Sequence, residues 1–280
     1  MSTSFNEFCL RYDLAEKALN LGDRSISYPK DNNVVILAGG AGSEKGVILD
    51  KLLTIRGKVF NVDDIKKTLV KLGDTSSLAK TFEKETHRSL GTIQLGEVGD
   101  TMIMHDFIKR HKLNDSLTST FFWANATNKY RPNVVFGVTL RDINKLQSIG
   151  ELCDIGNYRP INRHLVWVLT NIDLAIDQNA SRDRKVEQSI LLRTHEGASR
   201  TIEQLVKQSD RSIIDGDVWI VFNGITVNGR DLKLKGNVVQ SYHTFQLKQQ
   251  GKPWKSVHDI EQVIWDKINS YVPSSSKWTK

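Results

Sequence analysis

A short apolar run that leads into a glycine-rich turn and then a lysine constrains this chain more than any other feature. The run is Val34–Ala38, and the eight residues after it, from Gly39 to Gly46, read Gly-Gly-Ala-Gly-Ser-Glu-Lys-Gly. Strand, glycine-rich turn and helix in this order are typical of the P-loop, whose pattern is G-x-x-x-x-G-K-[ST]. Its glycines let successive backbone N–H groups face an anion at a helix N-terminus, and its lysine reaches the outer phosphates of a nucleotide.

The loop departs from that pattern at two positions. Glu44 stands where the second glycine is expected, and Gly46 replaces the hydroxyl that usually contacts Mg²⁺. A carboxylate turned toward the phosphates would repel them, whereas one turned to solvent would be harmless, so reduced or lost activity is an open alternative. We nevertheless predict a nucleotide-binding loop in which Lys45 contacts the β and γ phosphates. Its binding residues are Gly39, Gly40, Ala41, Gly42, Ser43, Glu44, Lys45 and Gly46.

The composition is that of an ordinary globular protein. Hydrophobic residues make up 39% and charged residues 25% of the 280 residues, which is enough for an apolar core. The sequence has no apolar run of about 18 residues and no signal-peptide pattern, so we expect a cytoplasmic protein without a membrane partner. Cys9 and Cys153 lack disulfide or metal-site spacing, and we predict no metal-binding residues. The net charge of +7 favours a polyanionic partner such as nucleic acid, although a merely basic protein explains it as well.

Further apolar runs alternate with helical patterns along the chain. Predicted strands cover 34–38, 58–62, 133–139, 164–170 and 217–223, and predicted helices cover 45–53, 64–72, 142–152 and 172–179. Continuous apolar runs, rather than alternating ones, indicate strands that are buried on both faces. The predicted fold class is therefore α/β: a five-stranded parallel sheet with helices on both faces, as in P-loop NTPases and kinases.

We divide the chain into an N-terminal helical extension at 1–32, a core at 33–224, and a basic C-terminal segment with a closing helix at 225–280. Within the core, residues 75–132 are predicted as a helical insert near the carboxyl ends of the strands, where it would shape an acceptor site. The last residues, 274–280, are expected to be loose.

Aromatic side chains among basic residues raise the question of base stacking. Trp123, with Tyr130 and Arg131, fits either a stacking platform or core packing. Trp254 lies between two lysines at 252 and 255 and is the better candidate for a surface that stacks a base.

Two aspartates follow the second predicted strand, at the edge of the sheet where the P-loop lies. A carboxylate there would accept the proton of an acceptor hydroxyl and orient its oxygen for in-line attack. We predict that Asp63 is this base and that Asp64 is the helix N-cap. The alternatives are that Asp64 is the base, or that both aspartates only cap the helix.

A cluster of cations follows the fourth strand and its helix. Arg182, Arg184 and Lys185 fit a basic lid, which would bring guanidinium groups to the transferring phosphoryl and exclude water. The alternative is that these cations lie in a solvent-exposed loop without a catalytic role. Because the cluster follows the P-loop and Asp63 in the order expected of a kinase, we add Arg182 and Arg184 to the predicted catalytic residues. His195 is expected on a helix surface or in support of this lid.

Several segments resemble one known family when they are taken together. They are Asn133–Thr139, His164–Asn171, Arg182–Arg184, Thr194–Gly197 and Val218–Asn223. In this order they look like bacteriophage-encoded P-loop kinases of the zeta-toxin and polynucleotide-kinase group, over roughly residues 33–224. The resemblance implies an enzyme that uses ATP and Mg²⁺, with Lys45 at the β and γ phosphates, Asp63 as base, and Arg182 and Arg184 in the lid.

Branches of that group phosphorylate 5-hydroxymethyluracil in phage DNA, UDP-N-acetylglucosamine, or the 5′-hydroxyl of polynucleotides. The resemblance and the positive charge favour transfer of the γ-phosphoryl of ATP to a hydroxyl on DNA, specifically 5-hydroxymethyluracil. The two other acceptors are alternatives that keep the kinase reaction. The alternative that is not a kinase is a module with a degenerate P-loop that binds nucleic acid or another partner.

Overall fold

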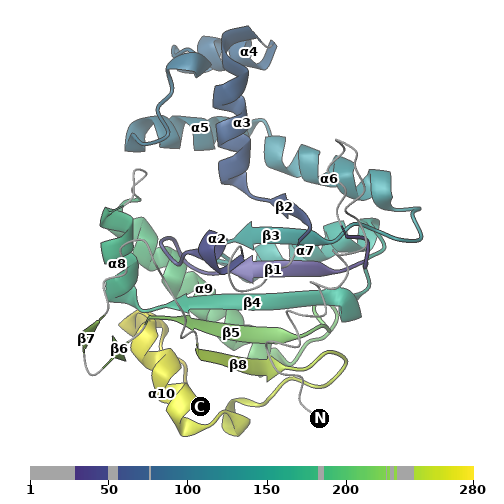
Figure 1. Ribbon diagram of the computed structural model, residues 1–280, viewed down its shortest axis with the longest axis vertical. Coiled ribbons are helices and arrows are strands. Elements are labelled where there is room, and N and C mark those ends of the chain that lie inside the picture. Colours follow the sequence, from purple (N-terminus) through teal and green to yellow (C-terminus); the bar gives the residue numbers. More distant parts are fainter. Residues whose placement is uncertain are drawn as a thin grey trace.

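The computed structural model describes residues 29–49, 56–75, 77–181, 186–224, 226–227, 230–231 and 243–280. The helix expected near the N-terminus, the second half of the helix predicted over 45–53, and both Arg182 and Arg184 lie outside these residues. Among the described residues, helices pack on both sides of one six-stranded sheet (Figure 1). The predicted α/β class is confirmed.

The sheet has the strand order β2-β3-β1-β4-β5-β8. Five of its strands run parallel: β1 (Val34–Ala38), β2 (Lys58–Phe60), β3 (Val134–Val138), β4 (Arg163–Thr170) and β5 (Val218–Asn223). β8 (His243–Lys248) pairs antiparallel with β5, and a separate small pair joins β6 (Thr226–Val227) to β7 (Arg230–Asp231). The predicted count of five strands is therefore wrong by one, because β8 lies in the C-terminal segment that was read as basic and polar.

Both faces of the sheet are covered, which is why its central strands are continuously apolar. Every residue of β1 and of β4 is buried. On one face, the sheet packs against α7 (Ile143–Ile155), α9 (Gln188–Gln208) and α10 (Gln262–Tyr271). On the other face, Ile48 of α2 (Lys45–Ile48) packs over the strands.

Several helices lie between β2 and β3. They are α3 (Val62–Leu72), α4 (Ser77–Thr86), α5 (Val98–Arg110) and α6 (Leu113–Asn125). The first three share a small core of their own around Phe82 and Phe107 and stand out from the β2 edge of the sheet (Figure 1). The remaining helix of the sheet region is α8 (Ile172–Ala180), which follows β4.

The C-terminal residues are packed rather than loose, contrary to the expectation. Trp278 is 3% exposed and belongs to the main core. Trp254 is also buried, and its indole Nε1 donates to Asp210 O at 2.9 Å. The role of Trp254 as a surface stacking residue is therefore ruled out, because its ring fills space between β8 and the loop that follows α9.

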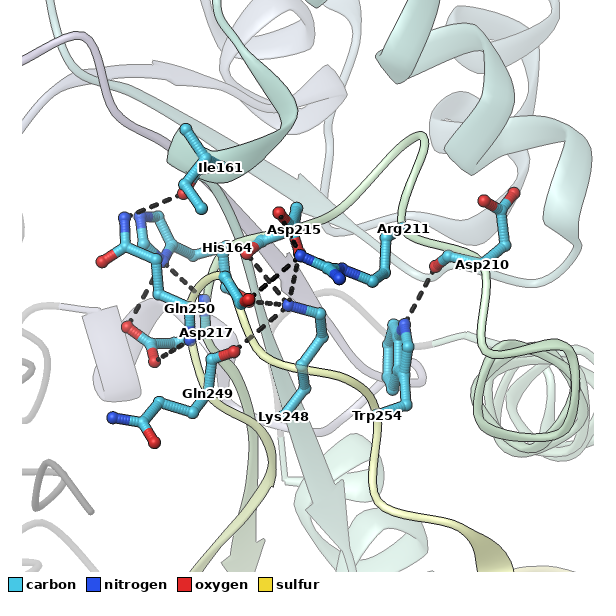
Figure 2. Close-up of polar contacts among 12 residues, drawn as sticks. Ile161, His164, Asp210, Arg211, Asp215, Asp217, Lys248, Gln249, Gln250 and Trp254 are labelled. Atoms are coloured by element: carbon cyan, nitrogen blue, oxygen red, sulfur yellow. Dashed lines mark hydrogen bonds and ion pairs between the residues drawn. The ribbon is translucent and has the colours of Figure 1, made fainter. Parts of the chain in front are cut away.

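A buried lysine fastens β8 to the start of β5 (Figure 2). Lys248 Nζ donates to Asp215 Oδ1 at 2.8 Å, and to the carbonyl oxygens of Asp215 and Gly216 at 2.9 and 3.3 Å. Burial lowers the pKa of Lys248, and the Asp215 carboxylate opposes that shift. Arg211 hydrogen-bonds the same carboxylate and lowers its pKa. These contacts satisfy the buried charges with protein groups, so the cluster is structural.

Candidate nucleotide-binding site

The P-loop, Gly39–Gly46, leaves the carboxyl end of β1 and turns into α2. A Cβ at Gly39 would lie 2.6 Å from Ser43 Oγ and 2.7 Å from Val168 O. Gly42 has a φ of +79°, and a Cβ there would lie 2.8 Å from Ala175 O. Only glycine fits at these two positions, because the loop turns tightly on itself and packs closely on β4 and α8.

Glu44 takes the backbone conformation that the pattern reserves for glycine. Its φ of 58° and ψ of 33° lie in the left-handed region, which costs a residue with a Cβ about 1 kcal/mol. The surrounding contacts therefore hold the loop in its shape in spite of the substitution. The left-handed residue stands directly before α2, at the position of its N-cap.

Lys45 lies across the loop. Its Nζ donates to Gly39 O at 2.8 Å, to Gly40 O at 3.1 Å and to Ser43 Oγ at 3.3 Å. The ammonium group is thus next to the backbone N–H groups of the turn, where it can neutralise an anion that they bind.

Side chains at the ends of two strands contact the backbone of the P-loop. Thr170 and Asn223 are the last residues of β4 and β5, and both are buried. Thr170 Oγ1 and Asn223 Nδ2 lie 3.3 and 3.4 Å from the carbonyl oxygen of Ser43. Asn223 also donates to Thr170 Oγ1 at 3.2 Å. Neither residue was predicted, although a polar side chain at the end of an apolar strand is a signal for a site at the carboxyl ends of the strands.

A third support comes from α9. Ala41 N–H donates to Thr194 Oγ1 at 2.9 Å, and His195 Nε2 lies 2.7 Å from Ala41 O. His195 is 4% exposed, so its expected place on a helix surface is wrong. The pKa of His195 is lowered to about 4, chiefly by burial and to a smaller extent by the nearby charge of Lys45, while the hydrogen bond to Ala41 opposes the shift. The imidazole is therefore neutral at pH 7.

Asp63 lies in the first turn of α3, just after the carboxyl end of β2. Its carboxylate is 41% exposed and its Oδ1 lies 3.8 Å from Nζ of the buried Lys66. Asn61 is the N-cap, because its side chain accepts from Asp63 N–H at 3.0 Å. The predicted capping role of Asp64 is therefore wrong: the helix begins two residues earlier than expected. The role of Asp63 as base stays a prediction.

The predicted lid arginines, Arg182 and Arg184, lie outside the described residues. The two helices on either side of them both touch the P-loop: α8 through Ala175, and α9 through Thr194 and His195. The chain therefore leaves the P-loop region along α8 and returns to it along α9.

The described residues do not form a cage for Mg²⁺. They contain no cluster of three or more His, Cys, Asp or Glu side chains that could hold a metal ion. Gly46 has no hydroxyl, and the hydroxyl of Ser43 is buried and bonded to Lys45. A magnesium ion that arrives with a nucleotide would therefore find no free hydroxyl at positions 43 and 46 of the loop.

The aromatic side chains predicted for base stacking in the helical region are exposed. Trp123 and Tyr130 are 66% and 60% exposed, so neither packs in the core. Tyr130 and Arg131 precede the start of β3, whereas the P-loop follows the end of β1, which runs parallel to β3. The two residues therefore lie at the opposite end of the strands from the P-loop. These residues are not brought together with the site.

Comparison with known proteins gives a fold but no family. Neither a protein-family model nor a curated protein matches the chain. A chain of the AvrRxo1-ORF1:ORF2 crystal structure with ATP is similar, with a TM-score of 0.54 and 11% identity over 99% of this chain and 70% of that one. The corresponding structure with sulphate ions has a TM-score of 0.54 at 10% identity. At such low identity the likeness establishes the fold alone.

A structure of the PezAT toxin-antitoxin system of Streptococcus pneumoniae aligns less well, with a TM-score of 0.41 and 15% identity over 79% of this chain and 76% of that one. Among the described residues, no helix is long and apolar enough to cross a membrane.

Proposed function

We propose that this protein is an ATP-dependent phosphotransferase that moves the γ-phosphoryl group to a hydroxyl on a nucleic acid or nucleotide. The geometry of the P-loop carries the proposal: Glu44 adopts the backbone conformation of the missing glycine, and Lys45 lies 2.8 Å from Gly39 O, across the turn. A shared fold with a structure that was crystallised with ATP supports the choice of nucleotide.

Four residues carry the chemistry in this proposal. Lys45 and the loop N–H groups hold the β and γ phosphates. Asp63 accepts the proton of the acceptor hydroxyl while its oxygen attacks the γ-phosphorus, and the bond to the β–γ bridging oxygen breaks to release ADP. Arg182 and Arg184 stabilise the charge on the transferring group.

The favoured acceptor is 5-hydroxymethyluracil in DNA. The resemblance of the sequence motifs and the net charge of +7 support a DNA substrate. A base in duplex DNA must be flipped out of the stack before its hydroxyl can reach the P-loop. A DNA acceptor would bind much more weakly as salt rises, whereas UDP-N-acetylglucosamine would respond far less.

Phosphoryl transfer from γ-labelled ATP with Mg²⁺ tests the proposal directly. The acceptors are hydroxymethyluracil DNA, unmodified 5′-hydroxyl DNA and UDP-N-acetylglucosamine. We expect label on the first, and its loss in Lys45→Ala and Asp63→Asn but not in Lys109→Ala, which changes an exposed lysine on α5. Label on a different acceptor would correct the substrate, and Asp63→Asn with full activity would reassign the base.

A binding module with a degenerate P-loop is the second candidate. Glu44 and Gly46, the two departures from the P-loop pattern, favour it. Titration calorimetry with ATP separates the two candidates: a folded protein without measurable ATP affinity would overturn the kinase proposal and support the module.

A further inference from the structure

Two neighbouring side chains of α9 hold both backbone polar groups of one P-loop residue. Thr194 Oγ1 lies 2.9 Å from Ala41 N, and His195 Nε2 lies 2.7 Å from Ala41 O. Both side chains are buried. The contacts join residues more than 150 positions apart in the sequence, so they depend on the docking of α9 and not on local loop geometry.

The direction of each hydrogen bond is fixed by its surroundings. Thr194 Oγ1 donates its single hydrogen to Leu191 O at 2.7 Å, which leaves a lone pair for Ala41 N–H. A carbonyl oxygen can only accept, so His195 Nε2 must carry the hydrogen that it shares with Ala41 O. Burial lowers the pKa of His195 to about 4, so the ring is neutral and is the tautomer with hydrogen on Nε2.

The imidazole ring also fits against the residue before Ala41. A Cβ built on Gly40 would lie 2.1 Å from His195 Cδ2, far inside van der Waals contact. Glycine at position 40 therefore makes room for the ring. Gly40, Ala41 and His195 form one packed unit in which a change at any member displaces the others.

We propose that Thr194 and His195 are positioning residues that select the phosphate-binding conformation of the P-loop. The inference rests on the proposed nucleotide binding. With both polar groups of Ala41 held by α9, its two peptide planes cannot rotate without breaking a buried hydrogen bond. Recognition of phosphate then falls to the N–H groups that follow Ala41. Without this restraint the loop occupies other conformations, and the apparent Kd rises as the competent fraction falls.

Calorimetric ATP titration of the full chain tests the proposal with matched variants. Thr194→Val keeps the shape and removes the acceptor, whereas Thr194→Ser keeps the acceptor. Ser199→Ala is the control: it removes two buried hydrogen bonds of α9, from Ser199 Oγ to Ser276 O at 2.9 Å and from Trp278 Nε1 to Ser199 Oγ at 3.0 Å, and neither touches the loop. Thermal unfolding of each variant reports on the fold.

We expect Thr194→Val to raise the Kd for ATP about tenfold, the change when the competent fraction falls to about one tenth. Thr194→Ser should stay within about twofold of the wild type, and Ser199→Ala should lower the melting temperature without changing the Kd. Equal Kd values for wild type and Thr194→Val would overturn the inference and leave the proposed function standing. A wild-type protein that does not bind ATP would overturn both.

A second pair of variants tests the packed unit even if Thr194→Val proves unstable. Gly40→Ala should weaken ATP binding in the wild-type background, because the new methyl displaces the His195 ring. In a His195→Ala background that ring is gone, so Gly40→Ala should cost little more. If Gly40→Ala weakens binding by the same factor in both backgrounds, the loop is not positioned through His195.

Discussion

Trp278 stacks on Trp167 of β4, with ring centroids 5.8 Å apart and an angle of 7° between the rings. Its indole Nε1 also donates to Ser199 Oγ on α9 at 3.0 Å. The C-terminal residues thus fasten α9 to the central sheet, and α9 is the helix that supports the P-loop.

Trp278→Ala should destabilise the fold by about 3 to 5 kcal/mol, because it opens a cavity in the core and removes the indole donor from Ser199 Oγ. Urea unfolding measures the change. Trp123→Ala is the control, since Trp123 is 66% exposed and its loss should cost less than about 0.5 kcal/mol. Equal effects for the two variants would mean that the C-terminal residues do not pack as described.

Lys248→Met should lower the free energy of unfolding by about 2 to 3 kcal/mol. The methionine keeps the apolar stem but removes the ammonium donor from the carbonyl oxygens of Asp215 and Gly216, of which the former keeps only the N–H of Gly251. The loss stays below that of a fully broken buried ion pair, because Arg211 still contacts the Asp215 carboxylate at 2.6 Å. Denaturant unfolding checks it, with Lys255→Met at an exposed site of the same segment as control. A neutral result would show that β8 is held by its backbone pairing alone.

Central strands were predictable and the edge strand was not, for one physical reason. β4 is buried on both faces and reads as a continuous apolar run, so sequence alone places it within one residue of its observed start. β8 alternates polar and apolar residues and ends in Lys248, whose burial depends on partners more than 30 positions away. No local pattern contains that information.

The same division holds for the site. The strand, glycine-rich turn and helix at 34–48 were predictable, because the glycines and Lys45 act within a single turn of chain. Thr194 and His195 occupy ordinary helical positions, and only the docking of α9 brings them to Ala41. The N-cap of α3 was predicted at the wrong residue. The helix begins at Val62, so its cap is Asn61 and not Asp64.

Glu44→Gly and Glu44→Gln separate two effects of the unusual P-loop residue. Glycine removes both the carboxylate and the left-handed strain, whereas glutamine removes only the charge. We expect both variants to bind ATP several-fold more tightly at low salt, by an amount that shrinks as salt screens the repulsion. Calorimetric titration at two salt concentrations measures it. Weaker binding by Glu44→Gln would instead mean that the carboxylate helps to hold the loop or the nucleotide.

The neutral, buried His195 should make stability depend on pH in a defined window. Its pKa is about 4 in the folded protein, against an ordinary value of 6.5, so between these values the unfolded chain binds a proton that the folded protein does not. The free energy of unfolding therefore falls as the pH drops through this window, by about 2 kcal/mol between pH 7 and pH 4.5 from this group.

Urea unfolding of wild type and His195→Gln at those two pH values isolates the contribution of His195. Glutamine does not titrate, so the pH-dependent loss should be smaller in the variant by about that same amount. Other histidines and carboxylates contribute equally to both proteins and cancel in the difference. If both proteins lose the same stability on acidification, His195 is not buried in its neutral form against the carbonyl of Ala41, and its hold on the P-loop must come from packing alone.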